Sequence, residues 1–351
     1  MIGIELFAGA GGMATGAEAA GIDIHIAVES NPFAAQTYLF NHKKTTVVVD
    51  EIQNIKEFSF SRDGEQVVLF GGPPCQGYSY LNRKTRNKNN PRNWLFKEFM
   101  RTIKLIDPDW IVIENVPGLK KMDNGYFLEA ICNDLHDNGY TPNFKILNSA
   151  NFGVPQYRER IFIVASKHGI AFDFPVGKYQ SKHITVGEAL SDLPPLYNGA
   201  MEDKLKYKEK ARNSYAKLLR GNKKVVTQNY VTRNSSLIIE RYKYIRQGSN
   251  WQDIPAELMS NYKDFTRCHS NIYRRLSNDK PSVIIANYRK SMLIHPIEDR
   301  GLSVREAARL QSFPDSYIFF GSLDQKQQQV GNAVPPLLAK AIFNKIIEYT
   351  K

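Results

Sequence analysis

The stretch VVLFGGPPCQGYS, residues 67–79, is the element around which we expect the rest of the chain to be arranged. Its first four residues are apolar and Gly-Gly-Pro-Pro follows them, which predicts a buried strand that ends in a loop. Such a strand delivers Cys75 to the mouth of a sheet. A lone cysteine is more often a small buried hydrophobe than a nucleophile. Here two prolines fix the backbone before Cys75 and the glycines let a ligand approach, so we favour a functional cysteine.

The first half of the chain alternates the patterns of strands and helices around this stretch. Apolar runs bounded by turn residues predict strands at 2–7, 22–28, 45–49, 67–70, 110–114 and, farther on, 161–164. Helical periodicity separates them, and Asn31-Pro32 supplies a cap and a first-turn proline for a helix that reaches Asn41. Parallel strands need crossover connections, so we expect a doubly wound, mostly parallel α/β sheet.

Two further helices are expected near the end of the chain. Ser303 and Glu306 form a capping box that opens a helix, and Pro314 should stop it. Pro335-Pro336 then begins a last amphipathic helix whose apolar residues should face the sheet.

Glycines and acids stand at or just past several of the predicted strand ends, where ligands of such sheets bind. They are the turn at residues 7–12, Glu29, Asp50-Glu51, Cys75 and Glu114. The turn lets a cofactor approach the backbone, and an acid about twenty residues on can accept ribose hydroxyls. Taken alone, the turn also fits a nicotinamide-dependent oxidoreductase. Glu114 ends an otherwise apolar strand, where a carboxylate is costly unless it is paired or used.

The positive charge of the chain is concentrated in one segment. The 351 residues carry a net charge of +12, and residues 201–290 account for all of it, with 20 Lys and Arg against 8 Asp and Glu. Tyrosines and Trp251 are interleaved with these charges. A solvated face is the plain alternative, but a single basic segment with aromatic side chains favours a nucleic-acid partner.

Composition argues against several other classes of protein. The chain is 42% hydrophobic, no apolar run approaches the length of a membrane span, and Glu5 breaks the short apolar start, so we expect neither a membrane segment nor a signal peptide. Cys75, Cys132 and Cys268 are far apart, and the histidines show no metal-ligand spacing. We therefore expect no disulfide and no metal, and a location in the reducing cytoplasm.

Six motifs, in this order, resemble those of the DNA cytosine-5 methyltransferases of bacterial or phage restriction-modification systems. They are FAGAGG (7–12), GPPCQ (72–76), ENV (114–116), QYRER (156–160), REAARLQ (305–311) and GNAVP (331–335). The resemblance covers nearly the whole chain, apart from the basic segment before the fifth motif. It implies a class I, Rossmann-like fold of the kind that binds S-adenosyl-L-methionine, together with a smaller target-recognition domain.

The resemblance also implies a mechanism and its residues. Cytosine C5 is a poor nucleophile, so a thiolate must first add to C6, and Cys75 matches that nucleophile. Glu114 matches the acid that hydrogen-bonds or protonates N3. Arg160 matches the arginine on the cytosine carbonyl, and Arg158 the one that helps to hold the catalytic groups in place. The target cytosine must leave the duplex to reach Cys75, so base flipping is implied.

The methyl donor implied by the resemblance is S-adenosyl-L-methionine, and its predicted contacts follow from matching positions. They are Phe7, Ala8, Gly9, Gly11, Gly12, Glu29, Ser30, Asp50, Glu51, Ile52, Pro73, Leu95, Asn332 and Ala333. Within this set, Glu29 matches the ribose acceptor and Leu95 an adenine contact. The family generally has Asp-Ile at the third strand end. This chain reads Asp50-Glu51-Ile52, so the adenine-facing acid is left open between Asp50 and Glu51.

The resemblance divides the chain into two domains. Residues 1–170 and 325–351 are predicted to form the catalytic domain, and residues 171–324 the target-recognition domain, which includes the structural segment 303–314. The predicted partner is double-stranded DNA. We expect a monomer, with any cognate restriction endonuclease acting separately.

Two rival functions share this resemblance. A tRNA cytosine-5 methyltransferase of the same fold would share most motifs. Enzymes of that branch, however, carry a Cys-Phe-Thr signature in the recognition region, whereas Asp264 precedes Phe265-Thr266 in this chain. A catalytically silent DNA-binding relative is disfavoured because Cys75, Glu114 and Arg160 are all present.

Overall fold

The computed structural model describes residues 1–74, 95–262 and 271–350. These residues fall into two compact units. Unit 1 takes Met1–Ser149, Glu159–Gly177 and Pro336–Lys351, and unit 2 takes Ala150–Arg158 and Lys178–Pro335. The functional division into a catalytic and a recognition domain, with its boundaries at 171 and 325, stays a prediction.

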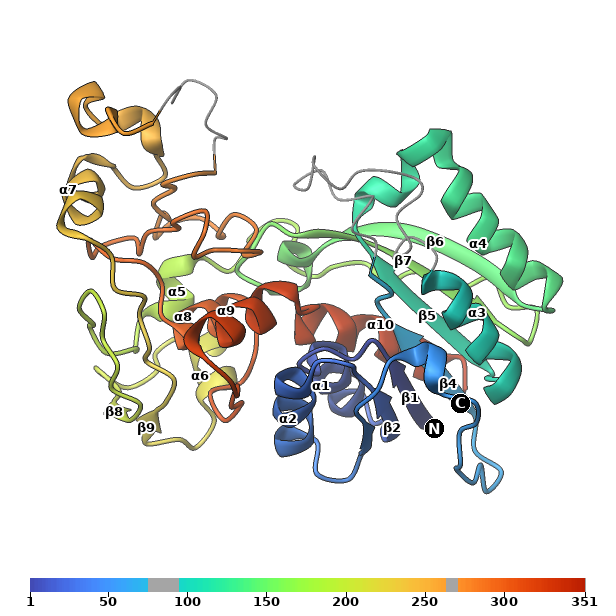
Figure 1. The fold of residues 1–351 in the computed structure, drawn as a ribbon. Helices are drawn as coiled ribbons and strands as arrows, with labels where there is room; N and C mark the ends of the chain where they lie inside the picture. Colours follow the sequence, from blue (N-terminus) through green and yellow to red (C-terminus); the bar gives the residue numbers. More distant parts are fainter. Residues whose placement is uncertain (75–94, 263–270, 351) are drawn as a thin grey trace. The chain divides into compact units, whose positions relative to one another are not determined.

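Unit 1 is built on a seven-stranded sheet in the order β3-β2-β1-β4-β5-β7-β6 (Figure 1). Its strands are β1 (Ile2–Leu6), β2 (Asp23–Val28), β3 (Thr46–Val48), β4 (Val67–Gly71), β5 (Trp110–Asn115), β6 (Thr141–Asn148) and β7 (Glu159–Ser166). The first five strands pair in parallel, and β7 runs antiparallel to both of its neighbours. The predicted doubly wound, mostly parallel sheet is confirmed.

Strand β6 was not predicted from the sequence. It is an edge strand whose central residues Asn143, Phe144 and Lys145 are exposed, so it lacks the apolar run that marks the other strands. Pro142 lies within it, and an edge strand tolerates proline because one row of its amides needs no partner in the sheet. Strand β6 is recognised only in the folded structure, by its antiparallel pairing with β7.

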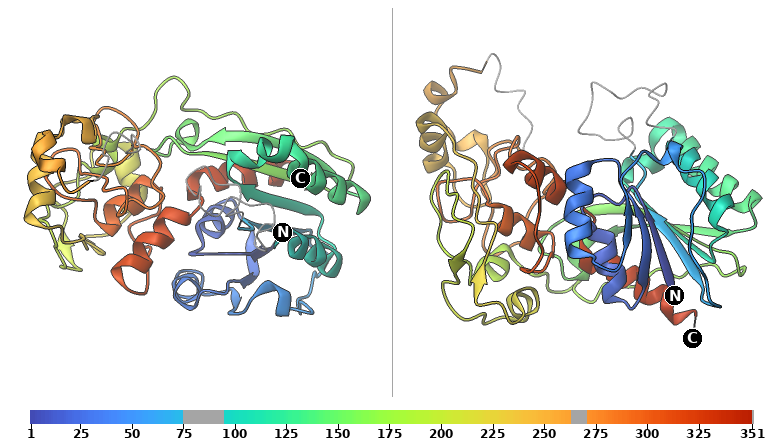
Figure 2. Two further views of the ribbon diagram at one scale, coloured as in Figure 1. Left: turned by 45° about the horizontal axis from the view of Figure 1, so that its top comes forward. Right: turned by 60° about the horizontal axis from the view of Figure 1, so that its bottom comes forward.

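Helices cover both faces of the unit 1 sheet. They are α1 (Gly12–Ala19), α2 (Pro32–Asn41), α3 (Leu95–Ile106), α4 (Tyr126–Asp137) and α10 (Pro336–Glu348). Side chains alternate along β1, so Ile4 joins the apolar cluster under α3 and α4, whereas Glu5 faces Tyr38 of α2. Figure 2 shows the blue helices α1 and α2 on one side of the strands and the teal α3 and α4 on the other. The sheet is thus a buried central layer.

The starts of α2 and of the helix after Ser303 were predicted correctly from their capping residues. The Asn31 side chain accepts hydrogen bonds from the amides of Phe33 and Ala34 at 3.0 and 3.1 Å, and Pro32 occupies the first turn of α2. The capping box of Ser303 and Glu306 is also present at the start of α8 (Val304–Leu310).

The predicted end of α8 was wrong. The helix ends at Leu310, four residues before Pro314. Ser312 adopts a left-handed backbone with φ of +64°, and the amide of Phe313 donates back to the carbonyl of Ala308 at 2.9 Å. This turn supplies hydrogen-bond donors for the final carbonyls of the helix. The turn therefore ends the helix, and Pro314 comes after that end.

Unit 2 has little regular structure in its described residues, and its interior combines buried apolar side chains with many buried polar ones. Besides α8 it contains α5 (Val186–Leu190), β8 (Leu205–Lys206), α6 (Ser214–Arg220), β9 (Val225–Val226), α7 (Ser236–Tyr244) and α9 (Leu323–Asn332). Short 3-10 turns complete the two units: η1 (Ile52–Asn54), η3 (Pro117–Lys120), η4 (Met122–Gly125), η5 (Ser149–Phe152), η6 (Trp251–Asp253) and η7 (Ala256–Met259).

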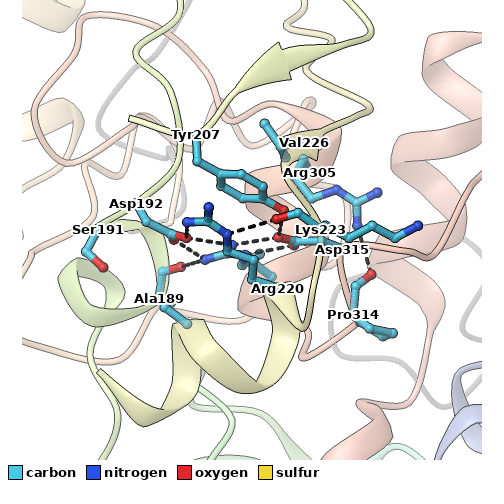
Figure 3. A network of polar contacts seen from close by, with 12 residues as sticks. Ala189, Ser191, Asp192, Tyr207, Arg220, Lys223, Val226, Arg305, Pro314 and Asp315 are labelled. Atoms are coloured by element: carbon cyan, nitrogen blue, oxygen red, sulfur yellow. Dashed lines mark hydrogen bonds and ion pairs between the residues drawn. The ribbon is translucent and has the colours of Figure 1, made fainter. Parts of the chain in front are cut away.

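A buried polar network of unit 2 surrounds Arg309. Its guanidinium lies 2.6 Å from the carboxylates of both Asp192 and Asp315, and all three side chains are fully buried. Tyr207 donates its hydroxyl to Asp315 at 2.6 Å, and Arg305 donates to backbone carbonyls that include that of Pro314 (Figure 3). Both arginines therefore act as interior scaffolding of unit 2, the role predicted for segment 303–314.

A second buried pair in unit 2 makes stability depend on pH. Arg300 donates to both carboxylate oxygens of Glu306 at 2.8 and 2.7 Å. Burial alone would raise the pKa of Glu306, but Arg300 outweighs it and lowers that pKa from its ordinary value of 4.5 to about 2. The unfolded chain therefore takes up this proton at a higher pH than the folded chain does. The contribution to stability is complete above about pH 5 and is lost as the pH falls towards 2.

We expect the wild type to lose about 3 kcal/mol of stability from this group between pH 6 and pH 2, a loss that the Glu306→Gln variant does not share. Urea unfolding at a series of pH values measures the difference. Glu257→Gln, at an exposed position of the same unit, is the control and should follow the wild type. Parallel pH profiles for wild type and Glu306→Gln would contradict the assignment.

Candidate functional site

The glycine-rich turn follows β1 and leads directly into α1. Phe7, Gly9 and Gly11 all adopt left-handed backbone conformations, with φ of +54°, +56° and +78°. Such a conformation is unusual for phenylalanine and marks a turn that its surroundings hold in place. A Cβ atom added at Gly9 would meet no atom within 4 Å. The turn therefore leaves open space on this side, where a ligand can approach the backbone.

Glu29 lies beside this turn, just past the end of β2. One carboxylate oxygen accepts from the amide of Gly9 at 2.7 Å, and the other accepts from the amide of Asn31 at 2.7 Å. The side chain thus ties the turn to the start of α2. Each oxygen accepts one of these bonds and has a second lone pair, so the half-buried carboxylate can still accept hydroxyl donors of a ligand. Ser30, the next residue, is exposed.

The third strand end distinguishes the two candidate acids. One Asp50 oxygen accepts from the Asn54 side chain and from the Glu51 amide, both at 2.7 Å, and these bonds lower the pKa of Asp50. None of the described residues donates to the exposed Glu51 carboxylate. Ile52 and Leu95 belong to the apolar interior: Ile52 is buried in the cluster under α3, and Leu95, the first residue of α3, packs against that cluster.

The predicted nucleophile Cys75 lies outside the described residues, which reach Pro74 on this side. The loop that leads to it is fastened to β5, because Asn115 donates its side-chain amide to the carbonyl of Pro73 at 3.3 Å. A Cβ atom added at Gly72 would stand 2.8 Å from a Glu114 oxygen. A side chain at this position would press on the Glu114 carboxylate, so glycine lets the loop pass close to it without displacing it.

Glu114 and Arg160 form an ion pair at the carboxyl end of β5. The Arg160 Nε atom lies 2.8 Å from Glu114 Oε1, and the two side chains are only 13% (Glu114) and 9% (Arg160) exposed. Their strands are adjacent and antiparallel, with Glu114 opposite Phe162. The structure thus places the two predicted catalytic groups of β5 and β7 in direct contact, in a largely desolvated position beside Gly72.

Arg158 differs from the sequence-based expectation. Alternation along a strand predicted that Arg158 and Arg160 point to the same side, but β7 begins only at Glu159 and the rule does not reach Arg158. Arg158 belongs to unit 2, is 1% exposed and donates to the carbonyls of Ile285 and Gly331, both at 3.1 Å. It clamps two backbone segments of that unit together.

Asn332 and Ala333 end helix α9, also in unit 2. The exposed Asn332 accepts a hydrogen bond from Gln328 at 2.6 Å, and Ala333 is buried. Sequence reasoning missed a buried neighbour in this unit, Gln156. Its side chain accepts from the amide of Ile285 and donates to Gln311, both at 2.9 Å. Its place in the QYRER motif was the available signal.

Two other residues of unit 1 were also missed. Asn115 is a polar residue at the end of an apolar strand, and its contact with Pro73 joins the loop before Cys75 to the Glu114 strand. Glu5 is an acid in the middle of a strand whose residues are all buried, a pattern that is costly without partners. Both could have been noticed from residue type and position alone.

The sheet order, the reversed strand β7 and the glycine-rich first turn belong to an α/β fold that solved methyltransferase structures share. The fold agrees with solved structures: a DNA modification methyltransferase of E. coli encoded within a prophage has a TM-score of 0.80 at 23% identity over 99% of both chains. The Entamoeba histolytica methyltransferase EhMeth has a TM-score of 0.62 at 18% identity, covering 100% of this chain and 99% of that one.

Sequence comparison identifies the family. Residues 1–348 match the model of the C-5 cytosine-specific DNA methylases. Type II methyltransferase M1.HphI of Haemophilus parahaemolyticus is 34% identical over 98% of this chain and 86% of its own. Type II methyltransferase M.DdeI of Desulfomicrobium norvegicum is 32% identical over 99% of this chain and 88% of its own. The chain belongs to the C-5 cytosine-specific DNA methylases, and it is a DNA cytosine-5 methyltransferase related to the type II modification enzymes.

The described part of the chain contains no helix with the length and apolar character needed to cross a membrane.

Proposed function

We propose that this enzyme transfers a methyl group from S-adenosyl-L-methionine to C5 of a flipped-out cytosine within a specific sequence of double-stranded DNA, through a covalent bond between Cys75 and C6. The observation that carries the proposal is the buried pair of Glu114 and Arg160 at 2.8 Å, next to the Gly72-Pro73 loop that leads to Cys75. The residue types match the chemical demands of the reaction.

The reaction begins with addition of the Cys75 thiolate to C6. The bond between sulfur and C6 forms as the C5=C6 double bond opens, and C5 gains the electron pair of an enamine. When bound, S-adenosyl-L-methionine would supply an electrophilic methyl group to C5, with cleavage of its S–CH3 bond and S-adenosyl-L-homocysteine as the leaving group. Loss of the C5 proton then restores the C5=C6 double bond as the sulfur leaves C6. The thiolate is regenerated and the product is 5-methylcytosine.

Glu114 assists the addition by donating a hydrogen bond or a proton to N3 of the cytosine, which withdraws charge from the ring as sulfur attacks. Arg160 orients the Glu114 carboxyl through their contact and, by resemblance, also meets the cytosine carbonyl. A pair already fixed before the base arrives needs little rearrangement in the transition state. The roles predicted for Arg158, Asn332 and Ala333 stay predictions, since the contacts described above are all inside unit 2.

The residues around the glycine-rich turn suit the methyl donor. The open space at Gly9 admits a ligand close to the backbone, and the Glu29 carboxylate retains lone pairs for the two ribose hydroxyls. At the third strand end Asp50 is engaged by its own loop, so we assign the adenine-facing role to Glu51. Phe7, Ala8, Gly11 and Gly12 complete the turn.

Replacing Glu29 by alanine is expected to weaken donor binding about 10- to 100-fold. The change removes the ribose acceptor and also releases the Gly9 and Asn31 amides that shape the turn. Calorimetric titration with S-adenosyl-L-methionine measures the loss. The control is Glu57→Ala, the same change at an exposed position of unit 1. Equal affinities of the Glu29→Ala variant and the wild type would remove Glu29 from the donor site.

The basic segment 201–290 is the proposed source of DNA affinity. Its 20 Lys and Arg against 8 Asp and Glu favour contact with phosphates, whereas only a few side chains read the base edges. We further propose that the enzyme works as a monomer in the cytoplasm and that any cognate endonuclease acts separately.

Bisulfite sequencing of a plasmid recovered before and after expression of the enzyme tests the whole proposal. Methylated cytosines confined to one short recurring sequence are the expected result, and they identify the recognition site at the same time. A plasmid without new 5-methylcytosine, together with methylation of tRNA from the same cells, would overturn the assignment of DNA as substrate.

A further inference from the structure

The carboxyl group of Glu5 is buried on the face of the sheet that α1 and α2 cover. Glu5 is 2% exposed, and its neighbours across the sheet are Ala27 of β2 and Phe70 of β4, which are both fully buried. No described Lys, Arg or His lies within ion-pair distance of it. A carboxyl group in such surroundings needs hydrogen-bond partners to be tolerated.

Two polar groups lie beside this carboxyl group, and they come from different helices. The Tyr38 hydroxyl of α2 lies 2.8 Å from Glu5 Oε2. The backbone amide of Ala14 in α1 is close enough to the same carboxyl group to lower its pKa. Tyr38 is itself fully buried, and its ring packs against His42 at 4.5 Å. His42 in turn contacts Glu18 of α1 at 2.9 Å, so a second polar contact joins the same two helices.

Helix α1 needs such an acceptor because its own sequence does not supply one. The first amides of a helix have no partner inside the helix, and Ser, Thr, Asp or Asn usually serves as the cap. Here the capping position is Gly11, whose backbone is left-handed and which has no side chain to accept a bond. Ala14 is the third residue of α1. The Glu5 carboxyl group therefore lies where a capping side chain would ordinarily stand, beside the third residue of the helix.

We propose that Glu5 is a positioning residue for donor binding: through Ala14 and Tyr38 it fixes the start of α1 against α2, and so holds the glycine-rich turn in its binding shape. The turn spans the few residues between Glu5 in β1 and the first turn of α1, so Glu5 and Ala14 stand at its two ends. Glu29 is the matching link on the other side, between Gly9 and the start of α2. This inference rests on the proposed donor site at that turn.

The carboxyl group can perform this task uncharged. Burial raises the pKa of Glu5 well above its ordinary value, and the nearby Glu18 and Glu29 raise it further, against the lowering effect of the Tyr38 hydrogen bond and of the Ala14 amide. A neutral carboxyl group has one donor and several acceptor positions. The Glu5→Gln side chain offers the same set, since its carbonyl oxygen can accept from Ala14 and its amide can donate to the Tyr38 hydroxyl.

The test compares donor affinity in Glu5→Ala, Glu5→Gln and Tyr38→Phe, measured by calorimetric titration with S-adenosyl-L-methionine on the full chain. We expect affinity to fall about tenfold or more in Glu5→Ala and about threefold in Tyr38→Phe, and to remain within about threefold of wild type in Glu5→Gln. In steady-state assays the KM for the donor should rise while the KM for DNA is unchanged.

Thr102→Val is the matched control. Thr102 is fully buried in α3 on the opposite face of the sheet, where its hydroxyl donates to the Glu98 carbonyl at 2.9 Å. Its replacement should lower the melting temperature without changing donor affinity, which separates loss of stability from loss of positioning. If Glu5→Ala does not fold, Tyr38→Phe carries the test, since it removes one hydrogen bond and keeps the ring.

The outcomes separate this inference from the proposed function. A wild-type enzyme that binds no donor would overturn the donor site and the inference with it. A wild type that binds the donor, with unchanged affinity in Glu5→Ala or, if that variant does not fold, in Tyr38→Phe, would overturn the inference alone. Loss of affinity in Thr102→Val equal to that in the Glu5 or Tyr38 variants would also overturn it, because a general loss of stability would then explain the result.

Discussion

Replacement of Cys75 by serine is expected to reduce the rate of methyl transfer to DNA by at least about 10⁴-fold. An alcohol at pH 7 has almost no anionic form, so the addition to C6 that activates C5 no longer occurs. Incorporation of tritiated methyl groups into plasmid DNA measures the rate. DNA binding, followed by gel shift, should remain close to that of the wild type, since the change removes a nucleophile and not a phosphate contact.

Cys132→Ser provides the matched control for this experiment. Cys132 is half-buried on α4, where burial raises the pKa of its thiol and makes it a poor nucleophile, so that variant should retain normal activity. Trapping of a covalent adduct on DNA that contains 5-fluorocytosine is a second, independent measurement. Fluorine cannot leave as the C5 proton does, so the wild type and Cys132→Ser should form a stable covalent adduct and Cys75→Ser should not. Normal methylation by Cys75→Ser would refute the covalent mechanism.

Replacement of Glu114 by glutamine is the second large effect, with an expected loss of about 10²- to 10⁴-fold in kcat. Glutamine has the same shape and its carbonyl oxygen can still accept from Arg160, so the pair in the folded chain should survive. What is lost is the acidic proton for N3 of the cytosine. Single-turnover methylation with saturating DNA and donor isolates the chemical step, and the KM for the donor should change little.

Glu98→Gln serves as the control for Glu114→Gln. Glu98 also pairs with an arginine of unit 1, Arg101, at the same distance of 2.8 Å, but that pair lies on the more exposed surface of α3. Loss of a surface ion pair costs little, so this variant should methylate at the wild-type rate. A wild-type kcat in Glu114→Gln would show that N3 needs no acid, and the proposed role of Glu114 would then be wrong.

The candidate site was predictable to the extent that its chemistry follows from residue type at a strand end. Glu114 is an acid after a buried apolar run, and Glu29 follows another, so residue type and position are enough to select both. Their partners could not be selected in this way. Glu114 meets Arg160 because β7 inserts antiparallel beside β5, and the chain order alone does not predict which strands become neighbours.

Arg158 shows where a local rule stops applying, because it lies outside the strand to which the rule refers. Two arginines separated by one residue point the same way only within a strand, and β7 starts between them at Glu159. The end of α8 is a similar case, because the left-handed Ser312 reverses the chain before Pro314 can act. In both cases the sequence pattern did not locate the end of the element: β7 includes Arg160 but not Arg158, and α8 ends at Leu310.

What the sequence by itself determined is the order along the chain of the strands of the sheet other than β6, several of the helices, and the class of enzyme. Apolar periodicity, the cap at Asn31, the capping box at Ser303 and the six ordered motifs are all local patterns, and local hydrogen bonds and burial are sufficient to produce them. The tertiary structure alone decided which distant groups meet. Glu5 with Ala14 and Tyr38, and Glu114 with Arg160, depend on how strands and helices pack. Hydrogen-bond partners for a buried carboxyl group could come from many positions along the chain. Which residues become its partners is decided only when the sheet and the helices pack together.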